Sequence, residues 1–179
     1  MATSVTGSQI DQALEEAGLL GSSVIPKNFK NQVVVHVTYG GNVGTVQAGA
    51  TYAVADTQGE PSISFNAPAG TDSRFTVVLA DPDAPSRDNP KWAPYLHFVL
   101  ADVVPGQAAG QTIVSYMGPA PPQGSGPHRY VINVYAQPVD HVPTLPGEPD
   151  ARQSFPLIKF VTDNELKLVG ATFFYAENK

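Results

Sequence analysis

Apolar and polar residues alternate over several stretches of the chain after Pro26, and this period of two predicts β-strands with one buried face. Glycine, proline and asparagine residues separate the stretches, as expected for turns. The rows are Val33, Val35 and Val37; Phe75, Val77 and Leu79; Leu96, Phe98 and Leu100; His128, Tyr130, Ile132, Val134 and Ala136; and Thr172 and Phe174, which alternate with Ala171, Phe173 and Tyr175. The chain is therefore predicted to be rich in short, half-buried strands.

Helical spacing occurs in two short segments. Near the N-terminus, Ser8 can cap a helix whose apolar positions are Ile10, Ala13, Leu14 and Ala17. We therefore expect a helical N-terminal segment over residues 1–25. A second short helix is expected within residues 154–166, where Pro156 suits the first turn better than the middle.

The order of these elements predicts the fold class. Many strands with few helices indicate a mainly β protein, an antiparallel β-sandwich with Greek-key connections, because strands and helices do not alternate as a parallel sheet requires. The 17 prolines and 16 glycines gather mainly in the predicted connections. We expect a single domain over residues 1–179, in which residues 138–149 form a surface loop.

Composition and charge narrow the function classes. A net charge of −6 disfavours a nonspecific nucleic-acid binder and a polybasic membrane anchor, because both need clustered Lys and Arg. Neither a transmembrane helix nor a signal peptide is recognisable, so we expect a cytoplasmic protein, with peripheral membrane or vacuolar association as the alternative. The absence of cysteine excludes a thiol mechanism.

The sequence DPDAP at residues 81–85 places two carboxylates, those of Asp81 and Asp83, just past a predicted strand. Prolines at both sides of Asp83 restrict how these carboxylates point, so a fixed loop would hold them at one mouth of the sandwich. The alternative is ordinary turn chemistry, in which the aspartate side chains cap nearby backbone amides.

His97 follows another proline-containing stretch. It shares a predicted strand face with Tyr95 and Val99, opposite the row that begins at Leu96, and this face could line a pocket. The alternative is a hydrogen-bonded histidine with a purely structural role.

His128 gives a stronger signal because it opens a strand directly after GSG at residues 124–126. The glycines allow exposed backbone amides, and Tyr130 points to the same side as His128. Arg129 points to the opposite face and is expected to be structural.

These groups together predict an anion pocket. Imidazoles, a tyrosine hydroxyl and exposed amides can hold a phosphate or carboxylate, while the aspartates orient the imidazoles and favour their protonated form. Trp92 could add a cation–π contact to a zwitterionic head group. We expect no catalytic residue, metal or cofactor: the His and Asp spacing matches no recognised metal motif, and Gln123 stands where a GxSxG nucleophile motif needs its first glycine. A phosphoester hydrolase using His128 and Asp81 is the less favoured alternative.

Three motifs resemble the phosphatidylethanolamine-binding protein family: DPDAPS at residues 81–86, YLHF around His97, and GSGPHRYV at residues 124–131. The resemblance extends over about residues 5–179. YMGPAPP at residues 116–122 and the final FFYAENK are most similar to the fungal branch related to carboxypeptidase Y inhibitor. The resemblance implies a sandwich of a large central sheet and a smaller sheet, with an anion-accepting pocket at one end.

The resemblance also implies which residues form the pocket. They are Asp81, Asp83, Pro85, Trp92, His97, Gly118, Ala120, Pro121, His128 and Tyr130, with Trp92 at the rim. Ala120 replaces the second glycine of the wider family's GxGPP, and this departure is expected either to narrow the pocket or to change which amide faces the ligand. The resemblance further implies cis peptide bonds before Pro85 and Pro94.

The function implied is that of a non-enzymatic binding and regulatory protein. Its ligand would be a phosphate-containing small molecule, a phospholipid head group or a phosphorylated partner, and its candidate protein partners are a serine carboxypeptidase and a signalling kinase. The alternative is a protein-interaction scaffold that works through the sandwich face or residues 138–149.

Overall fold

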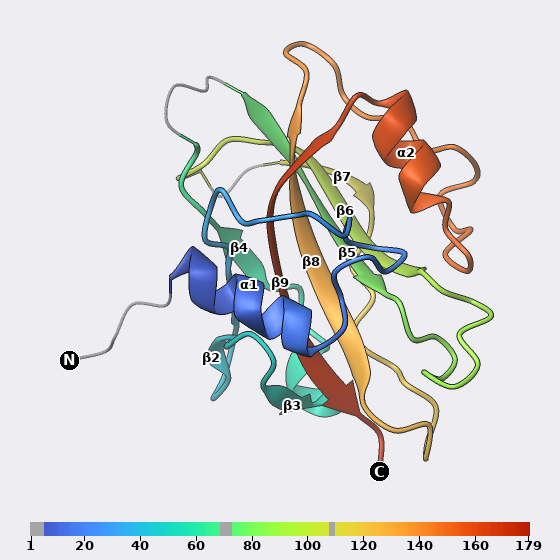
Figure 1. Ribbon diagram of the computed structural model, residues 1–179. Helices are drawn as coiled ribbons and strands as arrows, with labels where there is room; N and C mark the ends of the chain where they lie inside the picture. Colours follow the sequence, from blue (N-terminus) through green and yellow to red (C-terminus); the bar gives the residue numbers. More distant parts are fainter. Residues whose placement is uncertain (1–5, 69–72, 108–109) are drawn as a thin grey trace.

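The computed structural model describes residues 6–68, 73–107 and 110–179, whose strands form a large and a small sheet (Figure 1). The large sheet has the order β3 (Thr51–Ala53), β9 (Lys167–Glu177), β8 (His128–Gln137), β5 (Arg74–Asp81), β6 (Tyr95–Val103) and β7 (Gln111–Val114). The small sheet has the order β2 (Gly44–Thr45), β1 (His36–Tyr39) and β4 (Ser62–Ser64). The helices are α1 (Gly7–Glu16), the 3₁₀ helix η1 (Val54–Thr57) and α2 (Leu157–Asp163).

The large sheet is antiparallel except at one edge. Each strand from β9 to β7 runs antiparallel to its neighbours, whereas β3 runs parallel to β9, with Thr51 opposite Tyr175. The predicted mainly β sandwich with a large and a small sheet is confirmed. The parallel edge was not predicted, because three residues are too few to show a pattern.

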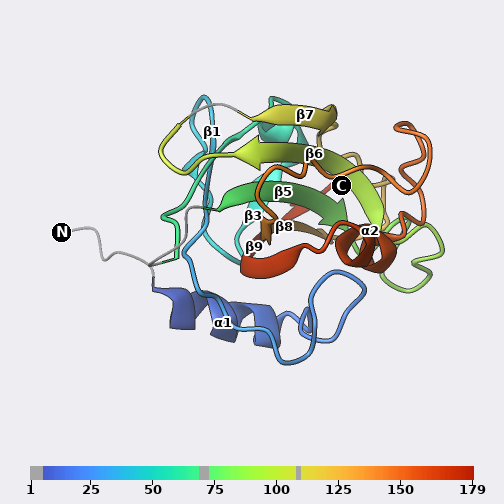
Figure 2. The ribbon, with the colours of Figure 1, turned by 90° about the horizontal axis from the view of Figure 1, so that it is seen from above.

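Both faces of the large sheet are buried, each by a different layer. Helices α1 and α2 and the chain between Leu19 and Ile25 cover one face, and β1 lies on the other side (Figure 2). Neighbouring residues of a central strand therefore enter different cores: Val77 packs beneath the small sheet and Val78 beneath the helices. This double burial explains why the central strands carry so few polar residues.

Both helices start differently from the prediction. The cap of α1 is Thr6, not Ser8: the Gln9 side chain accepts the Thr6 backbone N–H at 2.9 Å and completes a capping box. Helix α2 lies within residues 154–166 as predicted, but Pro156 stands before it rather than in its first turn. Residues 1–5 of the predicted N-terminal segment lie outside the described residues.

Two connecting segments also differ from a simple strand pattern. Val33 and Val35 are buried as predicted but precede β1, and the backbone N–H of Val33 bonds to the carbonyl of Val169. Residues 138–149 form neither helix nor strand. The side chain of Asn164 ties this segment to α2, because its Oδ1 accepts the Thr144 N–H at 2.8 Å and its Nδ2 donates to the Thr144 carbonyl at 3.0 Å.

Strand β6 contains one extra residue at His97, because Leu79 pairs with Phe98 but the next residue of β5 pairs with Leu96. This β-bulge makes the predicted single row wrong: Leu96 packs in the core beneath the helices and Phe98 in the core beneath the small sheet. Buried Arg152 supports the bulge by donating from Nη1 to the carbonyls of Leu96 at 3.2 Å and His97 at 3.1 Å. A bulge of this kind redirects a side chain at the end of a sheet.

Candidate functional site

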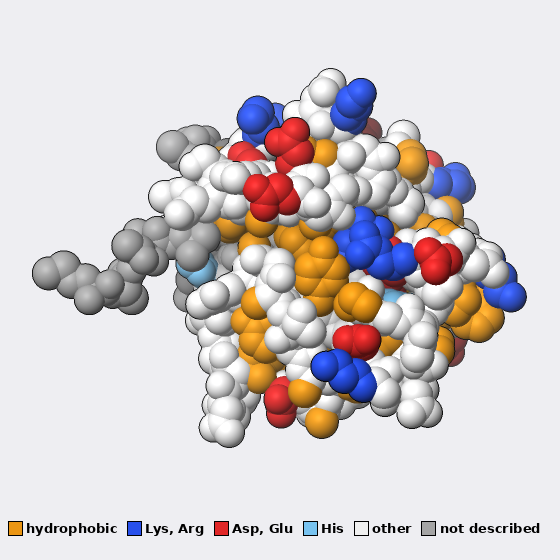
Figure 3. Space-filling model, turned by 60° about the horizontal axis from the view of Figure 1, so that its bottom comes forward, with side chains coloured by type: hydrophobic (Ala, Val, Ile, Leu, Met, Phe, Trp, Pro, Cys, Tyr) orange, Lys and Arg blue, Asp and Glu red, His pale blue; other side chains and the backbone are white. Residues whose placement is uncertain are grey.

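A cavity of about 220 Å³ opens at the end of the large sheet where β5 ends and β6 and β8 begin. In Figure 3 this end comes forward, and hydrophobic side chains are interspersed with side chains of both charges. The cavity is lined by Asp81, Ala84, Pro85, Trp92, Tyr95, His97, Met117, Ala120, Pro122, His128, Tyr130 and Gln153. Its volume is below the usual size of a drug-like ligand site, so it fits one small group.

Asp81 and His128 form a buried pair at the back of this cavity. The Asp81 Oδ2 lies 2.7 Å from the His128 Nδ1, and its Oδ1 accepts the backbone N–H of Asp83 at 2.6 Å. Both sequence interpretations of Asp81 therefore hold at once: one oxygen caps a turn amide and the other orients an imidazole. With one hydrogen bond on each oxygen, this carboxylate holds the histidine in position.

Ser125 completes a serine–histidine–aspartate arrangement but does not face the cavity. Its Oγ lies 3.0 Å from the His128 Nε2, and it also donates to the Pro122 carbonyl at 2.7 Å. A nucleophile must reach the substrate, and Ser125 is not among the lining residues. Its hydroxyl therefore fixes the ring of His128.

Two backbone amides of the glycine-rich turn before His128 are bonded to carbonyl groups of the chain itself. Gly124 and Gly126 have positive φ values of 73° and 79°, which favour glycine. The backbone N–H groups of Gly124 and Ser125 bond to the carbonyls of Asn178 and Pro122. The expectation that the turn offers both of these amides to a ligand is therefore wrong.

Asp83 lies beside the cavity wall but points away from the cavity. Its Oδ2 accepts the backbone N–H of Arg129 at 2.8 Å and the Arg129 Nε–H at 2.9 Å, and its side chain is 1% exposed. The hydrogen bonds that Arg129 donates to the Asp83 carboxylate raise the pKa of Arg129. Arg129 also donates to the carbonyl of Ala17, so this ion pair joins the DPDAP loop and β8 to the end of α1.

Of the two histidines that line the cavity, His97 is the one with a ring nitrogen available. Its Nδ1 lies 2.7 Å from the Met117 carbonyl and must donate, because a carbonyl only accepts. Among the described residues, its Nε2 has no partner, and this atom is not sealed from solvent. Burial lowers the pKa of His97 and outweighs the opposite effect of Asp81. The expected preference for the protonated form is therefore wrong for this residue, whose neutral ring presents an acceptor.

Tyr130 lies at the buried end of the cavity, and Trp92 lies at its exposed rim. Burial raises the pKa of Tyr130, so its hydroxyl stays protonated at neutral pH, and its ring meets that of His97 edge to face at 5.2 Å. Trp92 is 36% exposed, and Lys91 lies over its ring at 5.3 Å from the centroid. The tryptophan therefore already has a cation–π contact within the chain.

The predicted residues divide into two groups. Asp81, Pro85, Trp92, His97, Ala120, His128 and Tyr130 line the cavity, whereas Asp83, Gly118 and Pro121 do not. Gly118 is buried against η1: an added Cβ would lie 2.7 Å from the Gln58 Oε1. The peptide bonds before Pro85 and Pro94 are cis.

Sequence reasoning missed five lining residues and one support. The missed lining residues are Ala84, Tyr95, Met117, Pro122 and Gln153, and Arg152 holds the His97 bulge from behind. Tyr95 was identifiable from its place on the His97 strand face. Gln153 and Arg152 come from a loop with no motif, so only the tertiary structure brings them to the site.

A comparison with protein-family models matches residues 27–174 to the phosphatidylethanolamine-binding protein family. The chain belongs to this family. Among curated relatives, carboxypeptidase Y inhibitor of Saccharomyces cerevisiae is 37% identical over 60% of this chain and 61% of that protein. A putative odorant-binding protein, A5, of Drosophila melanogaster is 34% identical over 70% of this chain and 61% of its own length. The chain thus spans about three fifths of each of these relatives.

Solved structures agree with the family assignment. Carboxypeptidase Y inhibitor, in a crystal structure with its cognate proteinase, matches with a TM-score of 0.83 and 30% identity, over 99% of this chain and 98% of that chain. The phosphatidylethanolamine-binding protein of Plasmodium vivax shares the fold, with a TM-score of 0.75 and 23% identity over 94% and 97%.

Two further searches concern the described residues alone. None of their helices combines the length and apolar character needed to cross a membrane. No group of three or more His, Cys, Asp or Glu residues within them could hold a metal ion.

Proposed function

We propose that this chain is a non-enzymatic binding and regulatory protein whose cavity at His97 and His128 takes up a phosphate-bearing or other anionic group. The observation that carries the proposal is that one small cavity contains both the available Nε2 of His97 and the protonated hydroxyl of Tyr130. Behind them, Asp81 and Ser125 fix the ring of His128. The matching family model, which is named for a phosphate-containing lipid, supports this ligand class.

The protonation state of His97 controls how an anion enters. The neutral ring repels a fully ionised oxygen, because both atoms are hydrogen-bond acceptors. It can instead accept a hydrogen bond from the OH group of a monoprotonated phosphate. Alternatively the ring takes up a proton and becomes a donor. Both routes add a proton to the complex, so anion affinity is expected to rise as the pH falls from 8 to 6.

The test is isothermal titration of the protein with inorganic phosphate and with O-phosphoethanolamine at pH 6. The wild-type protein should bind both saturably, and His128→Ala should abolish binding. His36→Ala is the matched control, because His36 is exposed on β1, outside the cavity. Unchanged affinity in His128→Ala would contradict the proposal.

Because His128→Ala leaves Asp81 without its partner, a second variant keeps the buried pair intact. Ala120 is exposed and lines the cavity, so Ala120→Phe narrows the cavity without entering the core. This variant should fold normally and lose phosphate binding. Normal binding in a folded Ala120→Phe protein would place the ligand elsewhere.

Inhibition of a serine carboxypeptidase is the regulatory role that the relatives support best, since the inhibitor structure superposes over nearly the whole chain. A dose–response assay against carboxypeptidase Y should show progressive loss of peptidase activity. No inhibition at micromolar concentration would reject this role and leave the anion site to be judged by titration. A signalling kinase is the alternative partner.

The scaffold alternative predicts a different outcome. If partners bind a surface outside the cavity, partner capture by the folded His128→Ala and Ala120→Phe proteins should equal that of the wild type. Loss of partners in both variants would favour a role for the cavity.

A hydrolase is disfavoured by the geometry around His128. Both oxygens of Asp81 are engaged, and the Ser125 hydroxyl does not line the cavity. We therefore expect no turnover of a generic phosphoester such as p-nitrophenyl phosphate. Turnover by the wild-type protein that is lost in His128→Ala would support the hydrolase instead.

A further inference from the structure

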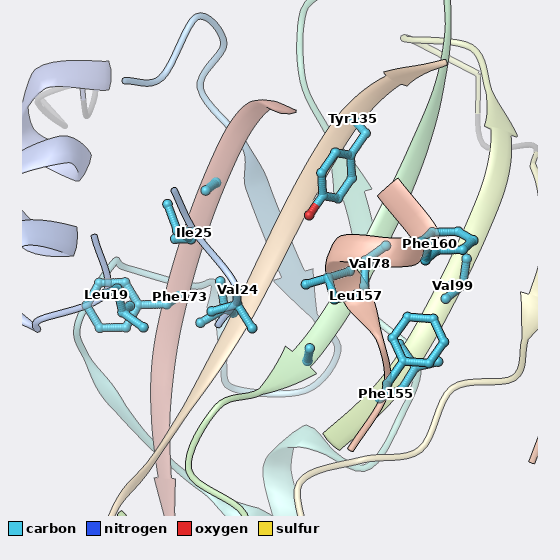
Figure 4. Packing of buried hydrophobic residues seen from close by; sticks show 14 of the residues in the cluster. Leu19, Val24, Ile25, Val78, Val99, Tyr135, Phe155, Leu157, Phe160 and Phe173 are labelled. Atoms are coloured by element: carbon cyan, nitrogen blue, oxygen red, sulfur yellow. The ribbon is translucent and has the colours of Figure 1, made fainter. Parts of the chain in front are cut away.

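A second and larger cavity, of about 630 Å³, lies on the other face of the large sheet, between residues 22–29 and α2. Its walls are mainly aliphatic or aromatic: Val24, Ile25 and Phe29 come from the N-terminal side, and Leu157 and Val161 from the helix. Figure 4 shows Val24, Ile25 and Leu157 in this core region. The volume falls within the usual range of sites for small organic ligands.

The cavity also contains a buried hydrogen-bond donor without an acceptor. The Asn133 Nδ2 donates to the Val24 carbonyl at 2.7 Å and to the Tyr135 hydroxyl at 3.0 Å. The carbonyl fixes the orientation of the amide, so the Tyr135 oxygen accepts and its hydrogen remains available. Among the described residues no group accepts that hydrogen.

Tyr135 is placed to use this hydrogen on a ligand. It lines the cavity, and in Figure 4 its hydroxyl is directed toward Val24 and Leu157. Burial raises the pKa of Tyr135, so the hydroxyl keeps its proton at neutral pH. An unpaired buried donor destabilises the folded chain, and an acceptor oxygen on a bound molecule removes that penalty.

A charged residue and an exposed apolar residue at the rim of this cavity indicate which other groups the ligand carries. Lys167 is the one charged residue in the lining, and within the described chain it forms no ion pair. Lys167 is exposed at the rim, where its ammonium group can pair with a carboxylate on a ligand. Ile158, at 73%, is the most exposed of the large hydrophobic side chains described, and it borders the same cavity.

We propose that this cavity binds one long-chain monocarboxylic acid, with its aliphatic chain between residues 22–29 and α2 and its carboxylate held by Lys167 and the Tyr135 hydroxyl. The ligand supplies what the cavity lacks: an acceptor for the tyrosine, a negative charge for the lysine and an apolar chain for the walls. The site is independent of the anion cavity. His128 and Tyr135 are seven residues apart, which corresponds to about 23 Å of strand, and the two side chains lie on opposite faces of the sheet.

The probe is monomeric dodecanoate, titrated by calorimetry into the full chain. The wild-type protein should bind one molecule saturably. Tyr135→Phe should weaken binding about tenfold and Lys167→Gln about fivefold, because each removes a contact to the carboxylate. Lys27→Gln is the matched control, since Lys27 lies in the same segment but outside the lining; its affinity should stay within about twofold of wild type.

Two further arms separate the alternatives. Val161→Trp fills the cavity from a half-buried position of α2 and should abolish binding, whereas His128→Ala should bind dodecanoate normally while losing phosphate. Absence of saturable binding, equal binding by Val161→Trp, or insensitivity to both Tyr135→Phe and Lys167→Gln would overturn the proposal. Binding to anionic vesicles without binding to monomeric dodecanoate would overturn it as well.

Discussion

The two cavities differ in how their polar groups are satisfied. At the end of the sheet, Asp81 and His128 have partners on both oxygens and both ring nitrogens, so their geometry is fixed before any ligand arrives. Beneath α2, no group among residues 6–68, 73–107 and 110–179 accepts the Tyr135 hydrogen or bonds to the Asn133 Oδ1. The comparison indicates that the first cavity is preorganised by its own hydrogen bonds, whereas the second is completed only by what enters it.

The largest test of this difference is to break the network behind the first cavity. Arg129→Met leaves the carboxylate of Asp83 buried without its cation, which should lower the free energy of unfolding by about 3 kcal/mol. Arg87→Met is the matched control, because Arg87 lies 4.0 Å from the same carboxylate but is 44% exposed. Its cost should stay below about 1 kcal/mol. Urea unfolding of both variants measures these losses. Equal losses in the free energy of unfolding would show that the buried Arg129–Asp83 pair stabilises the fold no more than the exposed Arg87 does.

Removing one hydroxyl from the network behind the first cavity, and one from the second cavity, sharpens the contrast. Ser125→Ala removes a hydroxyl that bonds to both Pro122 and His128, so it should cost about 1.5 kcal/mol of stability. Tyr135→Phe removes a hydroxyl that only accepts one bond from Asn133, whose amide keeps the Val24 carbonyl, and should cost about 0.5 kcal/mol. Thermal or urea unfolding measures both. A larger loss for Tyr135→Phe would mean that its hydrogen has a partner.

The smallest expected effect is the dependence of stability on pH through His97. Its pKa is lowered by burial from the ordinary value of 6.5, so the unfolded chain binds a proton more readily than the folded one. The contribution of His97 to stability is therefore full above pH 6.5 and is lost as the pH falls below that value. His97→Gln should flatten the stability profile between pH 5 and 7 relative to wild type. An unchanged slope would show that His97 does not titrate as described.

The two cavities also differ in how far the sequence predicts them. The first is built from residues whose types are unusual where they occur, such as His128 after a glycine-rich turn and aspartates between prolines, so motif and chemistry point to it. The bulge at His97 could not be predicted, because it depends on pairing with β5 and on the distant Arg152.

The second cavity has no such signal. Its walls consist of ordinary core residues from three distant segments, and their spacing predicts only burial. Lys167 gains meaning from its place in the lining, and Tyr135 from a hydroxyl hydrogen that nothing in the described part of the chain accepts; a sequence shows neither. Asp83 is a similar case. Its motif suggested a carboxylate that faces the ligand, but the carboxylate instead accepts hydrogen bonds from Arg129, 46 residues away in the sequence.

The most direct test of the anion site follows the His97 imidazole by NMR while the pH is varied, with and without phosphate. Without phosphate, the ring should titrate below 6.5. Bound phosphate stabilises the protonated ring, so it should raise the pKa of His97 and shift the resonances of His128 and Tyr130 with it. A His97 titration that phosphate leaves unchanged, with shifts confined to another surface, would contradict the assignment of this cavity.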